Sequence, residues 1–207
     1  MKIYFVRHGS TDAFERFETQ RSDEPLNAKG REQAKQLADR FSDVKLDAII
    51  SSSYTRAVET ASFIGKDFIV SPLFMETKKP SEIVGLAYDH PKAESVLRKV
   101  KEKFITDTFW HYSDEENFED LVKRGKEAIE FLKSQDRENI LVVSHGNFIC
   151  FLVTQILFGN EMTPQLILKI RNFMKLGNTG VSILTYENDK WHLEAWNDTS
   201  HFLESVL

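Results

Sequence analysis

The sequence predicts an α/β fold, a three-layer α/β/α sandwich around a mostly parallel sheet. Short apolar runs rich in β-branched residues alternate with stretches of helical periodicity, which is the pattern of βαβ units. The runs are apolar on both faces, as strands covered by helices on both sides should be. We expect strands at Lys2–Val6, Asp47–Ser51, Asp67–Val70 and Asn139–Val143, and a C-terminal hairpin made by Val181–Tyr186 and Trp191–Trp196.

Four helices are expected between these strands. The first begins after Asn27, a favourable N-cap residue, and the second begins near Tyr54, after three serines that could cap it. The third carries an apolar stripe from Phe118 to Leu132, and the fourth follows Gly146. Each of these helices has one apolar side that can pack on the sheet.

A long excursion separates two of the expected core strands. It contains a helical pattern around Ser95–Phe104 and an aromatic cluster at Phe109–Tyr112. An excursion of this length is more typical of a cap over a site than of a plain connection. We therefore predict a single domain over residues 1–207 with a cap-like helical insertion at about residues 74–138. The aromatic cluster either walls a pocket from above or packs the cap.

The composition favours an ordinary folded protein of the cytoplasm. Of 207 residues, 41% are hydrophobic and 29% charged, which argues against a disordered chain, and no apolar run approaches the roughly 20 residues that span a bilayer. The net charge of −5 gives no support to nucleic-acid binding. The single cysteine, Cys150, excludes an intramolecular disulfide and a Cys-rich zinc site. The first residues lack the pattern of a secretory signal.

Charged groups directly follow three of the expected strands. They lie in Arg7–Gly9, Ser51–Arg56 and Ser144–Gly146. In an open α/β sheet, ligands bind beyond the carboxyl ends of the strands, where these groups should meet. Each group alone is more often structural than catalytic. Two arginines and two histidines beside helix starts, however, are suited to a phosphate, which arginine binds in two-pronged geometry.

Several segments occur in an order that resembles a known family. They are Arg7–Thr11, Pro25–Ala34, Ser51–Ala61 and Val143–Gly146, followed by the closing segments Asn178–Gly180 and Asn197–His201. Together they resemble the histidine phosphatase superfamily, in the branch that includes cofactor-dependent phosphoglycerate mutases and small-molecule phosphatases. Each motif is modest alone, but four in order are a specific signal.

The resemblance implies a role for each matching residue. His8 would attack phosphorus and form a phosphohistidine, and Arg7, Arg56 and His145 would bind the three non-bridging oxygens. A carboxylic acid after the third strand would protonate the leaving group, and Glu76 matches that position. Glu82 is the rival for this task. Substrate-binding positions are expected at Gly9, Ser10, Gly146 and Lys78.

The chain also departs from the family pattern in two places. Phe14 stands where the family often has an asparagine, and the aromatic-glycine sequence common after the acid is replaced here by Thr77–Pro80. Lys78 and Lys79 could steer a second anionic group of the substrate, or could be ordinary solvated lysines. Gly9 and Gly146 are expected to let the backbone approach the ligand closely.

These observations lead to one preferred function and several alternatives. The preferred function is a metal-independent phosphatase, without a cofactor, that hydrolyses a small phosphomonoester through a phosphohistidine on His8. The sequence contains no paired-aspartate motif and no Gly-Lys-Ser loop, so it implies neither magnesium nor a nucleotide. A phosphoglycerate mutase-type phosphoryl transfer ranks second and a phosphohistidine-protein phosphatase third. A catalytically inactive phosphate-binding module and a zinc hydrolase rank lower. The physiological substrate, the oligomeric state and any cap motion stay open.

Overall fold

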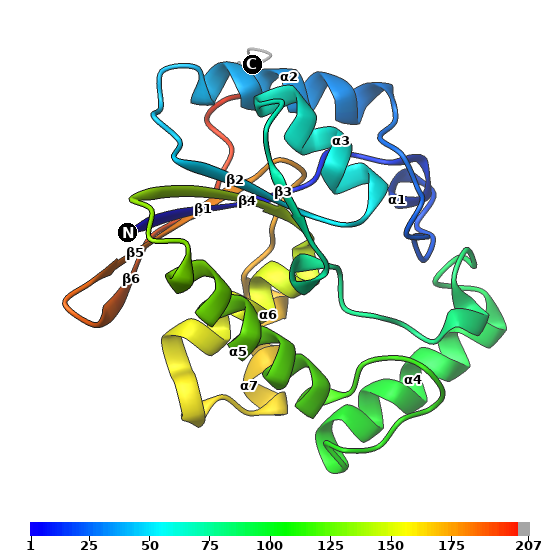
Figure 1. Cartoon of the computed structure of the whole chain (residues 1–207). Coiled ribbons are helices and arrows are strands. Elements are labelled where there is room, and N and C mark those ends of the chain that lie inside the picture. Colours follow the sequence, from blue (N-terminus) through cyan, green and yellow to red (C-terminus); the bar gives the residue numbers. More distant parts are fainter. Residues whose placement is uncertain (203–207) are drawn as a thin grey trace.

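A six-stranded sheet forms the centre of the computed structural model, which describes residues 1–202 (Figure 1). The strand order is β3-β2-β4-β1-β5-β6. The first four strands of that order are parallel, whereas β5 and β6 add an antiparallel hairpin at one edge. Their bounds are β1 Lys2–Arg7, β2 Ala48–Ser52, β3 Ile69–Ser71, β4 Asn139–Ser144, β5 Val181–Glu187 and β6 Lys190–Asp198. The predicted α/β class with a mostly parallel sheet is confirmed.

Helices cover both faces of the sheet, as a three-layer sandwich requires (Figure 1). On one face, Leu37 of α2 (Ala28–Phe41) and Ala57 of α3 (Thr55–Ile64) pack on the sheet. On the other face, the sheet is covered by α5 (Phe118–Ser134) and α6 (Gly146–Phe158), and α7 (Pro164–Phe173) packs against α6. None of the helices within residues 1–202 is both long and apolar enough to cross a membrane.

A separate helix, α4 (Pro91–Thr106), stands away from the sheet on the side of α5 and α7 (Figure 1). The short 3-10 helices η1 (Pro72–Phe74) and η2 (Ser81–Ile83) lie in the chain between β3 and α4. The remaining short elements are α1 (Asp12–Glu15) and η3 (Gly159–Glu161). Of the insertion predicted at residues 74–138, α5 lies in the main core through Ala128 and Leu132.

Two local predictions need correction. The predicted strand at Asp67–Val70 is not buried on both faces, because β3 is an edge strand and leaves Ile69 44% and Val70 49% exposed. No serine caps α3, since the Ser52 hydroxyl accepts from the amide of Tyr54, the N-cap residue itself. The sequence patterns used above also missed α7. Its Thr163 hydroxyl accepts from the amide of Leu166, which is an ordinary capping signal.

The C-terminal hairpin was predicted correctly, and its turn has a simple physical cause. Asn188 and Asp189 connect β5 to β6 with φ angles of 49° and 60°. A two-residue turn with both φ angles positive matches the twist of an antiparallel pair, and asparagine and aspartate tolerate this conformation best after glycine.

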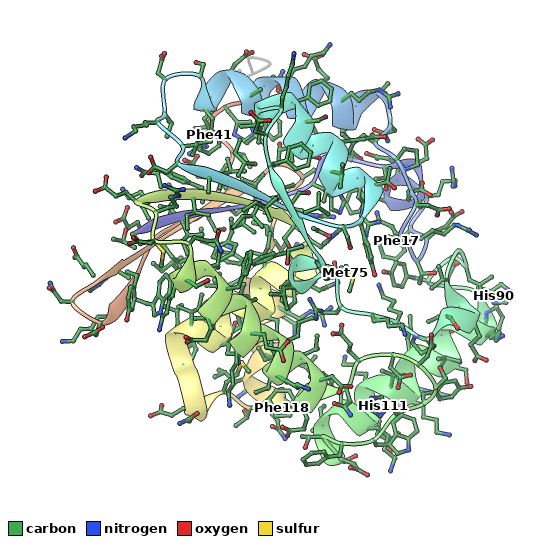
Figure 2. All side chains as sticks on the ribbon, viewed as in Figure 1. Phe17, Phe41, Met75, His90, His111 and Phe118 are labelled. Atoms are coloured by element: carbon green, nitrogen blue, oxygen red, sulfur yellow. The ribbon has the colours of Figure 1, made fainter. Side chains whose placement is uncertain are left out.

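The loop after α1 is tied to the segment that leads into α4. The ring centroids of Phe17 and Tyr88 are 5.2 Å apart, and the Tyr88 amide donates to the Phe17 carbonyl at 3.0 Å. A β-bridge also joins Glu18 to Ala87. Figure 2 shows Phe17 and His90, at the start of α4, on the same side of the molecule. These contacts hold the loop after α1 against the segment before α4.

Replacing Gly30 by alanine should destabilise the protein, although alanine normally favours a helix by about 1 kcal/mol. A Cβ atom at Gly30 would lie 2.0 Å from the Ser10 carbonyl oxygen, a backbone atom that cannot move freely. We expect the unfolding free energy to fall by about 1–3 kcal/mol, measured by urea denaturation. The control is Lys35→Ala, an exposed position of the same helix. An unchanged denaturation midpoint for Gly30→Ala would contradict the close contact.

Candidate active site

His8 lies just beyond the end of β1 and is buried, with 2% of its surface exposed. Its Nδ1 is 2.7 Å from the Gly9 carbonyl oxygen, which can only accept, so Nδ1 carries the proton. Its Nε2 therefore holds the free electron pair. The backbone is fixed on both sides, because the His8 amide donates to Ser144 and its carbonyl accepts from the Asn178 side chain. The ring thus presents one defined nucleophilic nitrogen.

Two guanidinium groups lie beside this imidazole. Arg56, in the first turn of α3, is 1% exposed, and its Nε donates to His8 Nε2 at 3.1 Å. Its Nη1 is held by the Arg21 carbonyl at 2.7 Å. Arg7, the last residue of β1, donates through Nη1 to the Leu176 carbonyl at 2.6 Å. Backbone carbonyls thus fix both cations without neutralising them.

His145 lies against His8, with ring centroids 5.0 Å apart. It follows β4 as the N-cap residue of α6 and is fully buried. Its Nε2 is 2.8 Å from the Ser52 hydroxyl oxygen, which already accepts from the Tyr54 amide. The hydroxyl proton is therefore free to point at Nε2, which places the proton of the imidazole on Nδ1. The ring of Tyr54 covers His145 at 5.1 Å.

Two polar atoms of this cluster have no hydrogen-bond partner within the part of the chain that the structure describes. They are His145 Nδ1 and Arg7 Nε, and both are buried. A buried donor without an acceptor costs about 1–3 kcal/mol, so proteins rarely leave two together without a reason. An anion with several oxygens would satisfy both donors at once.

Burial and the neighbouring cations keep both histidines neutral. Desolvation, followed by the charges of Arg56 and Arg7, holds the pKa of His8 well below its usual value. Desolvation and the charge of Arg56 lower the pKa of His145 in the same way. Burial lowers the pKa of Arg56 to about 10, which leaves it charged at neutral pH. The site therefore combines neutral imidazoles with permanent positive charge.

Glu76 approaches the same site from the chain after η1. Its Oε1 accepts from the amides of Thr77 and Phe148, and its Oε2 accepts from the amide and side chain of Asn147. The carboxylate thus caps the start of α6, whose N-cap residue, His145, makes no capping hydrogen bond of its own. The rival Glu82 lies elsewhere, 3.8 Å from Lys92 Nζ.

A cavity of about 810 Å³ opens over this cluster. Among the predicted site residues, those that line it are Arg7, His8, Arg56, Glu76, Lys78 and Gly146. His145 lies behind the lining, beneath Tyr54. Within residues 1–202, no group of three or more His, Cys, Asp and Glu side chains is placed to hold a metal ion.

Gly9 and Ser10 are not among the residues that line the cavity. A Cβ atom at Gly9 would lie 2.5 Å from the Gly30 carbonyl oxygen, so packing against α2 is sufficient to require a glycine here. The Ser10 hydroxyl donates to Glu15 at 2.7 Å and is fully buried. The two residues therefore fix the loop after β1. Only Gly146, whose added Cβ would lie 3.4 Å from Arg7 Nε, adjoins the cationic cluster.

The structure shows where Phe14, Lys78 and the aromatic cluster lie relative to the cavity. The ring of Phe14 covers the Arg7 guanidinium at 4.6 Å and lines the cavity. The Lys78 ammonium pairs with Asp114 at 3.3 Å at the cavity edge. The aromatic cluster does not line the cavity, since Trp110 and Tyr112 pack against each other and against Lys99 of α4. The aromatic cluster therefore packs the cap and does not wall the pocket, which were its two expected roles.

The sequence patterns did not assign a site role to three residues that hold the cluster in place. Ser52 contacts His145, Asn147 contacts Glu76, and Asn178 contacts the His8 carbonyl. Ser52 lies inside the motif Ser51–Ala61, and Asn147 directly follows the motif Val143–Gly146, so their positions at a strand end and a helix start were available signals. Asn178 is brought to His8 only by the folded chain.

The two neutral histidines predict how stability depends on pH. In the unfolded chain an imidazole takes up a proton near its ordinary pKa of about 6.5, whereas the lowered pKa values of His8 and His145 prevent this in the fold. The unfolded state then binds more protons, so the unfolding free energy falls as the pH drops from about 6.5 to about 5.

Denaturation at several pH values in this range tests the prediction. We expect the fall in unfolding free energy to be smaller in His8→Asn and in His145→Asn. His192→Asn, on an exposed position of β6, is the control and should keep the slope of the wild type. An identical slope in all four proteins would show that the two buried rings titrate normally.

Known proteins are similar to this chain along nearly its whole length. A family model described as "Histidine phosphatase superfamily (branch 1)" matches residues 3–199. The chain is 27% identical to the "Uncharacterized phosphatase PhoE" of Bacillus subtilis over 201 residues, covering 96% of this chain and 95% of that protein. It is 30% identical over 217 residues to the "Probable phosphoglycerate mutase GpmB" of an Enterobacter strain, with 97% and 94% covered.

Among solved structures, a phosphoserine phosphatase mutant of Entamoeba histolytica in complex with phosphoserine is similar to this chain. The TM-score is 0.80 and the sequence identity 25%, and the match covers 98% of this chain and 99% of that one.

Proposed function

Since the chain belongs to the histidine phosphatase superfamily, branch 1, we propose that it is a phosphatase that hydrolyses a small phosphomonoester through a phosphohistidine on His8. The observation that carries the proposal is the pairing of His8 and His145, whose ring centroids are 5.0 Å apart, beside the buried Arg56 and the half-buried Arg7. A phosphate placed there meets a neutral nucleophile and permanent positive charge. The similar phosphoserine phosphatase supports hydrolysis of a small substrate.

In the first chemical step, Nε2 of His8 attacks phosphorus and the bond to the ester oxygen breaks. Arg7, Arg56 and His145 bind the non-bridging oxygens, whose charge grows in the transition state. In the ligand-free site, Arg56 Nε donates to His8 Nε2, so this contact gives way to a phosphate oxygen when substrate binds. Glu76 enters this step as a carboxylic acid and gives its proton to the leaving alkoxide.

The second step restores the enzyme. Water gives its proton to Glu76, and its oxygen attacks the phosphorus of the phosphohistidine. The P–N bond breaks, the electron pair returns to Nε2 of His8, and phosphate leaves. Gly9, whose carbonyl holds Nδ1, keeps the same ring nitrogen reactive through both steps. No metal or cofactor takes part in this scheme.

The surroundings of the site support three accompanying proposals. Residues 1–207 act as one domain, in which the chain between η1 and α5 covers the cavity and favours small substrates over proteins. The compartment is the cytoplasm, in keeping with the free, buried thiol of Cys150. The partner is a small phosphorylated molecule.

Phosphate release from p-nitrophenyl phosphate in the presence of EDTA tests the proposed function. We expect activity that is unchanged by chelation. In a parallel assay, conversion of 3-phosphoglycerate to 2-phosphoglycerate without release of phosphate would replace the proposal by the mutase alternative. Release of phosphate from a phosphohistidine peptide, but not from small esters, would replace it by the protein phosphatase.

Replacing Glu76 by glutamine should affect substrates according to their leaving groups. An alkoxide needs a proton to leave, whereas p-nitrophenolate leaves without one. We therefore expect kcat/KM, which reports the step that releases the alcohol, to fall by roughly 10²–10⁴-fold for an alkyl phosphate and to change far less for p-nitrophenyl phosphate. Glu82→Gln is the matched control and should leave both rates unchanged. An equal loss of kcat/KM on both substrates would contradict the role of Glu76 as the acid for the leaving group.

A further inference from the structure

The outer part of the cavity is built differently from the catalytic end. Along α6, Gly146 and Asn147 lie at the catalytic end, and Cys150 and Phe151 line the cavity one turn further on. One helical turn advances about 5.4 Å, so the cavity extends well beyond the space for a phosphate. Its volume of about 810 Å³ is in the range that holds a whole organic ligand.

The walls of this outer part are apolar and come from two helices on the same side of the sheet, α4 and α7 (Figure 1). The helices meet where Phe104 packs on the cluster that contains Ile167. Val100, one turn before Phe104 on α4, and Leu168, the residue after Ile167 on α7, also line the cavity. An apolar groove therefore continues from the catalytic cluster to the space between α4 and α7.

Positive charge flanks this groove. Lys101 of α4 and Arg171 of α7 line the groove. Lys101 is three positions before Phe104, and Arg171 is four positions after Ile167. Each cation therefore lies on the face of its helix that makes the contact between α4 and α7. Lys175 and Lys79 line the cavity as well. None of the ion pairs formed within residues 1–202 includes any of these four cations.

The acidic residues of the cavity cannot balance these charges. The lining has seven Lys and Arg side chains but three Glu side chains. Glu76 accepts from the amides at the start of α6, Glu116 pairs with Arg124 at 2.6 Å, and Glu18 pairs with Arg16 at 3.0 Å. The cations of the groove thus remain available to a ligand.

We propose that this groove binds the alcohol part of the substrate, and that this part is an apolar chain with a second negative charge at its far end. The inference rests on the proposed function, because the phosphate of the same molecule occupies the catalytic cluster. Apolar walls bind the chain, and Lys101 and Arg171 bind the terminal anion. The substrate class is therefore an amphiphilic phosphomonoester with an anionic group at each end.

Binding of phosphonates tests this inference without requiring turnover. Alkylphosphonates and ω-carboxyalkylphosphonates of increasing chain length are titrated into the wild-type protein by calorimetry. Each added methylene should tighten binding by up to roughly fourfold until the chain outgrows the groove. At the best length, the carboxylate should improve the affinity by roughly fivefold over a methyl end.

The decisive comparison is between two double variants. Lys101→Gln with Arg171→Gln should abolish the preference for the carboxylate and keep the affinity for the alkylphosphonate. Arg98→Gln with Lys169→Gln removes one exposed cation from each of the same two helices outside the cavity lining and should keep the preference. Equal affinities for the two ligand series in the wild type, or a preference unaffected by the first double variant, would overturn the inference.

The observation that would contradict the proposed function differs from the one that would contradict the groove. If the wild type binds the carboxylated phosphonates tightly but releases no phosphate from p-nitrophenyl phosphate, the groove is supported and hydrolysis is not. If phosphate is released but neither chain length nor the carboxylate changes affinity, hydrolysis is supported and the groove is not.

Discussion

Replacing His8 by alanine is expected to lower kcat/KM for p-nitrophenyl phosphate by roughly 10⁴-fold or more. The variant keeps the two arginines but has no atom that can form a bond to phosphorus. His8 is 2% exposed, and within residues 1–202 its imidazole makes hydrogen bonds only with Gly9 and Arg56, so the fold should persist. The measurement is steady-state phosphate release at several substrate concentrations.

Binding separates a loss of chemistry from a loss of the site. His8→Ala should still bind inorganic phosphate, because Arg7 and Arg56 carry the charge. His192→Ala, at an exposed position of β6, is the matched control and should retain full activity. Residual activity of His8→Ala within tenfold of the wild type would mean that another group attacks phosphorus.

Replacing Arg56 by lysine should lower kcat by roughly 10²–10³-fold although the charge is conserved. The guanidinium contacts two groups at once, His8 through Nε at 3.1 Å and the Arg21 carbonyl through Nη1 at 2.7 Å. An ammonium group on a flexible stem cannot keep this two-pronged geometry. The phosphate oxygens would then lose a donor held in place before the reaction.

The control for this substitution is Arg40→Lys. Arg40 pairs with Asp198 at 2.6 Å and does not line the catalytic cavity, so the same chemical change there should leave kcat unaltered. Melting temperatures of both variants show whether folding contributes. A kcat of Arg56→Lys close to that of the wild type would mean that charge alone, without geometry, is sufficient.

Much of the fold could be predicted from the sequence because its signals are local. The strands that carry the motifs are short apolar runs, and each motif directly follows one of them, so the parallel sheet had to bring Arg7, Arg56 and His145 to one end. The N-cap at Asn27 and the turn at Asn188–Asp189 depend on residues within a few positions of each other.

Other features depend on contacts between distant parts of the chain, which no local pattern reveals. Gly9 has the appearance of a ligand-binding glycine, but the Gly30 carbonyl of α2 is what excludes a side chain. The edge position of β3 follows from the strand order, and a run of apolar residues does not distinguish an edge from a centre. The approach of Glu76 to the start of α6 likewise joins segments about 70 positions apart.

The covalent intermediate is the most direct test of the account. The wild type and His8→Ala are mixed with a ³²P-labelled phosphomonoester, quenched within milliseconds in alkali, which preserves phosphohistidine, and digested for mass spectrometry. The account predicts a label that is stable in alkali and lost in acid, located on His8 and missing from the variant. A label on another residue, or an equal label in His8→Ala, would contradict it.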